Sequence, residues 1–104
     1  MAQKRPTDEW ADYTRTIGVN IQRARQERGL SQEQVAYAAG LSRYTFQKFE
    51  KGESAPGEAA NPSLRNITAI AQVLEVGFED LLSHPWPELR AGRPVTGPPP
   101  RGAV

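Results

Sequence analysis

The sequence has no cysteine and a single histidine, His84, among its 104 residues. The absence of cysteine excludes disulfides, thiol nucleophiles and cysteine-ligated zinc. One histidine excludes a metal site built from histidines alone and disfavours a histidine-based catalytic centre. The chain also lacks a glycine-rich phosphate loop. Together, the lack of cysteine, the single histidine and the missing loop leave no nucleophile–base pair from which to build an active site. We therefore expect a protein that is not an enzyme and that needs no metal or cofactor, with His84 exposed and without chemistry.

Long apolar runs are missing as well. No stretch approaches the roughly 20 apolar residues that a membrane-spanning helix requires. The first six residues are polar and contain no apolar signal core. The formal net charge of +1 neither indicates nor excludes a nucleic-acid partner. These features favour a small cytoplasmic protein with no membrane partner. We expect one domain, since one hydrophobic core usually serves about 100–200 residues.

Proline and glycine cluster toward the end of the sequence. After residue 84 they occupy positions 85, 87, 92, 94, 97, 98, 99, 100 and 102. Such a composition cannot sustain a helix and offers few residues to bury. We expect residues 84–104 to form a mostly disordered tail, with polyproline II character at 98–100. Residues 1–6 are expected to be flexible, which leaves 7–83 as the folded domain.

Within the folded domain, apolar residues recur every three or four positions, as on one face of a helix. The first helix shows this spacing at Trp10, Tyr13, Ile17, Ile21 and Ala24. Further helices are predicted at about 32–39, 43–50, 63–74 and 78–82. Ser31 and Ser42 precede the second and third of these helices as caps. No segment alternates with period two for long enough to be a strand, so we expect an all-α fold of five helices.

The stretch GLSQEQVAYAAGLSRYTFQKFEKG, residues 29–52, holds two short helices separated by a turn at 40–42. A tight turn that contains glycine forces two helices to cross steeply. The small side chain of Ala36 allows the second helix to approach closely, and the apolar spacing places Phe46 and Phe49 in the core. The second of these helices is thereby presented outward as a unit.

A set of polar and apolar residues extends this pattern over about residues 14–82. The set comprises Ile17, Gly18, Ile21, Arg25, 29–32, Ala36, 40–42, Phe46, Glu50, Gly52, 61–64 and 76–82. With this set the chain resembles the helix-turn-helix family of lambda-like phage repressors, Cro proteins and bacterial Xre-type regulators. The resemblance implies a five-helix lambda repressor-like domain that binds double-stranded DNA.

In that family the third helix lies in the DNA major groove. The residues that the resemblance implies to read base edges are Arg43, Tyr44, Gln47 and Lys48. Their chemistry is suitable, because arginine and lysine pair with guanine and glutamine pairs with adenine. A merely solvated helix face is the alternative interpretation of these polar residues. For Tyr44 two interpretations remain equally open: the ring packs on a neighbouring side chain, or it contacts DNA.

Two further sets follow from the resemblance. The residues implied to contact the DNA backbone are Gln32, Thr45, Arg23 and Lys51. Arg25 and Glu50 resemble a structural pair that bridges the first and third helices. We expect a partly shielded salt bridge between them, which orients the recognition helix.

The chain departs from the family in its lengthened first helix, its long loop at 53–61 between the third and fourth helices, and its proline-rich tail. In the loop, Glu58 would repel a phosphate, so the loop either bends away from DNA or contacts a protein. Residues 12–56 carry seven Lys or Arg and five acids, a net of +2, whereas 57–82 carry one Arg and four acids, a net of −3. Since counterion release supplies much of DNA affinity, this small surplus predicts weak binding by a monomer.

Two functions remain open at this point. The first is a sequence-specific transcriptional regulator, most simply a repressor, that binds a near-palindromic operator as a homodimer on the nucleoid. The alternative is a protein-interaction module, such as the antitoxin of a toxin–antitoxin pair or a docking subunit of a larger regulator. Its partner would bind the first helix, the loop 53–61 or the tail. Trp10 and Tyr13 either extend the core along the first helix or form such a partner surface.

Overall fold

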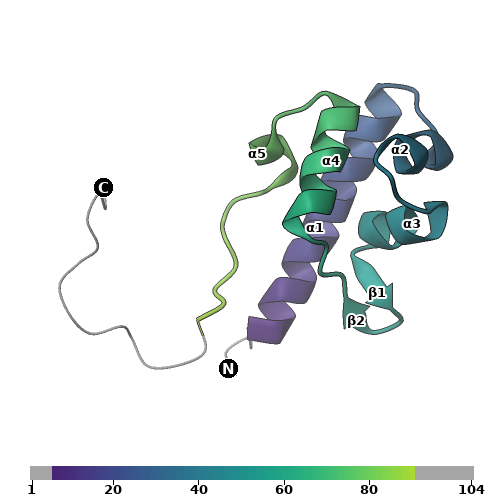
Figure 1. The fold of residues 1–104 in the computed structure, drawn as a ribbon. Helices are drawn as coiled ribbons and strands as arrows, with labels where there is room; N and C mark the ends of the chain where they lie inside the picture. The colour runs from purple at the N-terminus through teal and green to yellow at the C-terminus, as the bar shows by residue number, and fades with distance from the viewer. Residues whose placement is uncertain (1–5, 91–104) are drawn as a thin grey trace.

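The computed structural model describes residues 6–90. The elements in chain order are α1 (Pro6–Glu27), α2 (Gln32–Ala38), α3 (Arg43–Lys51), β1 (Glu53–Ala55), β2 (Glu58–Ala59), α4 (Leu64–Leu74) and α5 (Phe78–Leu81) (Figure 1). The predicted five-helix fold is confirmed, and a short hairpin is added to it. None of the described helices is both long enough and apolar enough to cross a membrane.

Serine caps set the starts of the three middle helices. Ser31, Ser42 and Ser63 each accept a hydrogen bond from the backbone N–H three residues on. At α2 the cap is reciprocal, because the Ser31 N–H donates to Gln34 Oε1 at 2.8 Å. These caps satisfy backbone donors that no helical carbonyl can reach. The sequence signals for the helix starts therefore act through hydrogen bonds within the first turn of each helix.

The first helix begins at Pro6, inside the segment that the sequence analysis assigned to a flexible N-terminus. Proline suits the first turn of a helix, since it lacks only an N–H that would have no helical partner there. The remaining residues of that segment, 1–5, lie outside the described part of the chain.

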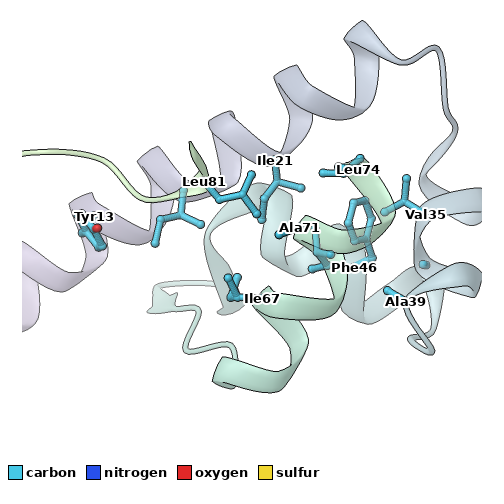
Figure 2. Packing of buried hydrophobic residues seen from close by; sticks show 12 residues of the cluster. Tyr13, Ile21, Val35, Ala39, Phe46, Ile67, Ala71, Leu74 and Leu81 are labelled. Carbon is cyan, nitrogen blue, oxygen red and sulfur yellow. The ribbon is translucent and has the colours of Figure 1, made fainter. Parts of the chain in front are cut away.

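The hydrophobic core gathers side chains from all five helices (Figure 2). Its largest fully buried side chains are Phe46, Ile21, Ile70, Leu74, Leu81 and Val35. Burial of each such side chain stabilises the fold by about 1.5–3 kcal/mol. Tyr13 is buried at the edge of this cluster and Trp10 packs against it, so the lengthened α1 extends the core.

The expectation that no segment forms a strand was wrong for residues 53–59. β1 and β2 pair antiparallel, with Glu53 opposite Ala59 and Ala55 opposite Glu58. Each strand is too short to show a period-two pattern, which is why the periodicity missed them. The available signal was the Pro56-Gly57 dipeptide, since Pro-Gly marks turns and Gly57 has the positive φ, 80°, that a tight turn requires.

Beyond α5, the chain returns along α1. Asn20 Nδ2 donates to the Leu81 carbonyl at 3.0 Å and to Ser83 Oγ at 2.7 Å. The ring centroid of Trp86 lies 6.2 Å from that of Tyr13 and 4.5 Å from that of His84, which is exposed. Residues 84–90 contain neither helix nor strand. The rest of the expected tail, including 98–100, lies outside the described residues.

Candidate nucleic-acid interface

The helix α3 turns one face into the core and the other outward. Phe46 and Glu50 are buried, and Phe49 is half-buried. On the outward side the side chains that the sequence analysis assigned to base reading are brought together. Arg43 and Tyr44 are exposed, while Gln47 and Lys48 are partly exposed. One rigid element thus carries four polar or basic side chains with donors that can reach a ligand.

A buried ion pair fixes the orientation of this helix. Arg25 Nε donates to Glu50 Oε2 at 2.6 Å, and Arg25 Nη2 donates to Glu50 Oε1 at 3.1 Å. The side chains are only 12% and 4% exposed. Arg25 also donates from Nη1 to the Leu30 carbonyl at 2.9 Å, so α1, the turn before α2 and α3 are joined. This fork geometry is the strong form of an arginine–carboxylate pair.

The structure directs Gln32 to the same carboxylate. Gln32 Nε2 donates to Glu50 Oε1 at 2.8 Å. The sequence analysis had assigned Gln32 to a phosphate and had not anticipated this bond. Glu50 consequently accepts from both α1 and α2, and the side chain at the start of α2 is held in place.

Two of the outward side chains have neighbours that restrict them. Lys48 Nζ lies 4.2 Å from the centroid of the Tyr44 ring, a cation–π contact one helical turn apart. Tyr44 nevertheless remains 68% exposed. Arg43 Nη1 lies 3.6 Å from Glu33 Oε1 of α2, and both side chains are exposed. An exposed pair of this kind contributes little stability, so Arg43 can exchange its partner for a ligand.

The side chains assigned to the DNA backbone lie in different places. Thr45 is half-buried and its Oγ1 accepts from Ser42 Oγ at 3.0 Å, beside the helix cap. Lys51 is exposed at the end of α3. Arg23 is exposed on α1 rather than on α3. Of this set, Thr45 and Lys51 lie on α3 together with the residues assigned to base reading.

The hairpin lies next to the C-terminal half of α3 (Figure 1). Side chains of the hairpin and of α3 line a groove between them. The groove holds about 250 Å³ and is lined by Tyr44, Gln47, Lys48, Lys51 and residues 53–57. One wall of the groove is formed by α3 and carries the cations Lys48 and Lys51, and the other wall is formed by the hairpin. Sequence reasoning missed this wall because it treated 53–61 as an irregular loop.

In this chain a short turn joins two short helices, and a buried ion pair holds the second helix, which carries polar side chains outward. This arrangement defines the class of helix-turn-helix DNA-binding regulators. A family model described as a helix-turn-helix domain matches residues 16–84. The chain belongs to this helix-turn-helix family of transcriptional regulators, of the Xre type. Its activity is DNA binding rather than enzymatic catalysis.

Two relatives agree with this assignment. The chain is 31% identical over 72 residues to the uncharacterized HTH-type transcriptional regulator y4dJ of Sinorhizobium fredii, covering 69% of this chain and 86% of that protein. It is also similar to the crystal structure of the restriction-modification controller protein C.AhdI from Aeromonas hydrophila. That match has a TM-score of 0.59 and 30% identity, and covers 66% of this chain and 96% of the other.

Proposed function

We propose that this protein is a sequence-specific transcriptional repressor that binds a near-palindromic operator as a homodimer, with α3 in the major groove. The observation that carries the proposal is the outward face of α3, where Arg43, Gln47 and Lys48 lie on a helix anchored by the Glu50 ion pair. A reading helix needs this combination, because side chains discriminate bases only when the backbone that carries them is held still.

Each reading side chain has a partner that its chemistry favours. Arg43 can donate a bidentate pair to guanine O6 and N7, and Gln47 can pair with adenine N6 and N7. Lys48 can donate to guanine or to a phosphate, with Tyr44 packed on its ammonium group. These contacts are expected to specify the sequence.

A second group of side chains positions the protein without reading bases. Lys51 and Arg23 offer charge to phosphates, and Thr45 offers a hydroxyl. Gln32 retains a second amide N–H beyond the one donated to Glu50, and that donor can reach a phosphate.

The small basic surplus supports a homodimer. Residues 12–56 carry seven cations and five acids, so a single domain can neutralise few phosphates. Two copies double both the phosphate contacts and the base contacts, and place their recognition helices about one helical turn apart. Occlusion of the promoter by such a dimer is the simplest route to repression. The description of C.AhdI as a controller protein supports a regulatory role.

The decisive experiment selects duplexes from a random pool with the purified protein at physiological salt. We expect two inverted half-sites about one helical turn apart. The triple variant Arg43→Ala, Gln47→Ala, Lys48→Ala should lose the motif, whereas Arg90→Ala, which removes a charge outside the interface, should keep it. A single half-site would contradict the dimer, and no enriched motif would contradict sequence-specific binding. Repression is tested separately, with a reporter that carries the selected site.

A further inference from the structure

The segment that follows α5, residues 83–90, forms one wall of a groove on α1, and we call it the return segment. Asn20 Nδ2 of α1 holds its start by donating to Ser83 Oγ at 2.7 Å. Farther along, the ring centroid of Trp86 lies 6.2 Å from that of Tyr13. Between the return segment and α1 remains a groove of about 190 Å³.

The lining of this groove combines aromatic rings with carboxylates. The return segment contributes the rings of His84 and Trp86, and α1 contributes the carboxylates of Glu9 and Asp12. Trp86 is 57% exposed although His84 packs on it with 4.5 Å between the ring centroids. Aromatic-lined grooves are typical docking sites for proline-rich peptides, whose preformed extended helix loses little entropy on binding. The adjacent carboxylates favour a peptide that also carries a cation.

Glu9 is the carboxylate with the greater freedom to bind such a cation. Asp12 is already paired with Arg15 on the same helix. Glu9, in contrast, makes neither a hydrogen bond nor an ion pair through its side chain within residues 6–90, and it is only half-buried. A guanidinium group that enters the groove can therefore use Glu9 without displacing an existing partner.

The sequence beyond the return segment contains a peptide of this chemistry. Residues 91–104 carry two cations, Arg93 and Arg101, and no acid. Three consecutive prolines at 98–100 directly precede Arg101. This stretch therefore offers both proline rings and a guanidinium group next to them, which matches the two parts of the groove.

The connecting chain is long enough for these prolines to return. From Pro87, which itself lines the groove, to residues 98–100 an extended chain spans roughly 35 Å. Gly92 and Gly97 lie between them, and glycine adopts the backbone conformations that a reversal of direction requires. The length of the chain therefore does not prevent docking within one molecule.

We propose that residues 98–101 dock in this groove of their own chain, with the prolines on the Trp86 ring and the Arg101 guanidinium on the Glu9 carboxylate. An arginine–carboxylate pair is a strong, charge-assisted contact. The tether favours docking as well, because a short flexible linker gives an effective concentration on the order of millimolar. The contact fastens the end of the chain to α1 and does not depend on the proposed function of α3.

The full-length chain tests this inference with a spin label. Since the sequence has no cysteine, Ala103→Cys creates a single attachment site for a nitroxide, two residues after Arg101. Docking should broaden the NMR signals of the Trp86 indole N–H and the Thr16 amide until they are lost. The amide of Tyr37, on α2 at the other end of the fold, should keep its intensity (Figure 1). Full intensity at Trp86 and Thr16 would overturn the inference.

Charge reversals in the labelled chain then identify the contact. Arg101→Glu should restore the lost signals, and the combination of Arg101→Glu with Glu9→Lys should lose them again. The control Arg93→Glu makes the same change in charge on the same stretch and should leave the broadening in place. Equal recovery from Arg101→Glu and Arg93→Glu would show general electrostatic attraction and overturn the pairing with Glu9. Both arginines lie beyond the folded residues, so neither single variant should disturb the fold.

A mixture of two samples tests whether the contact forms within one molecule. Labelled chain without nitrogen-15 is mixed with unlabelled wild type that carries it. Docking within one chain predicts no loss of the Trp86 signal in the mixture. A loss there would assign the groove to the tail of a second copy and overturn the intramolecular inference. Replacement of all three prolines at 98–100 by alanine in the labelled chain should weaken the broadening, and unchanged broadening would exclude the prolines from the contact.

Discussion

Gly18 of α1 lies directly against the backbone of Glu50 in α3. A β-carbon at position 18 would overlap the Glu50 carbonyl and would lie 2.7 Å from the carbonyl oxygen of Phe49. The absence of a side chain therefore sets how closely α3 approaches α1. The Arg25–Glu50 ion pair then sets its orientation at that distance.

The close approach predicts that Gly18→Ala destabilises the fold by about 1–3 kcal/mol, the usual cost of forcing extra volume into a packed contact. Urea denaturation measures this cost. The control Gln22→Ala, at an exposed position of α1, should stay within about 0.5 kcal/mol of the wild type. An unchanged midpoint for Gly18→Ala would mean that α1 and α3 can separate without loss of stability.

Removal of the anchor should cost more. Glu50→Ala leaves Arg25 buried without its carboxylate partner, a change that costs about 3–5 kcal/mol, and it also removes the acceptor of Gln32. Arg15→Ala breaks an exposed pair with Asp12 instead and should cost less than about 1 kcal/mol. Equal denaturation midpoints for the two variants would contradict the anchoring role of Glu50.

The proposed division between base-reading and backbone-positioning side chains predicts different effects on DNA binding. Arg43→Ala should cost about 1–3 kcal/mol and relax preference at one base position of the selected site. Lys51→Ala should weaken binding to all duplexes alike and lower the salt slope by about 1. Titrations with the selected duplex and its single-base variants separate the two. A uniform loss from Arg43→Ala would move Arg43 to the positioning group.

The buried hydroxyl of Tyr13 predicts that the folded protein loses stability at alkaline pH. Its hydroxyl is buried and makes no well-formed hydrogen bond within residues 6–90, and burial raises the pKa of Tyr13 although the nearby Ser83 backbone opposes the change. Because the folded-state pKa exceeds the ordinary value of 10.0, the neutral Tyr13 hydroxyl makes its full contribution to the free energy of unfolding below that pH. It is lost as the pH rises through the folded-state pKa.

Tyr13→Phe should remove this part of the alkaline loss and should be no less stable than the wild type at neutral pH. Thermal unfolding between pH 8 and pH 11 tests this. The control Tyr37→Phe, at an exposed position, should keep the alkaline loss of the wild type. Identical pH profiles for the wild type and Tyr13→Phe would exclude Tyr13 as the titrating group.

The helices and the outward face of α3 could be predicted because their signals are local. The caps at Ser31 and Ser42 act on backbone groups three residues away, and the apolar spacing selects which side of each helix is buried. The outward direction of Tyr44 and Lys48 follows from that spacing alone, since Phe46 and Glu50 occupy the opposite side of α3.

The hairpin and the second partner of Glu50 could not be predicted in this way. The bonds that hold them join residues far apart in the chain, such as Trp10 to Ala60 and Gln32 to Glu50, and exist only once α1, α2 and α3 have packed. The sequence by itself determined five helices and the outward side of α3, through local hydrogen bonds and the period of an α-helix. Only the tertiary structure decided that the first helix supports a hairpin beside α3, because that arrangement depends on contacts with no local pattern.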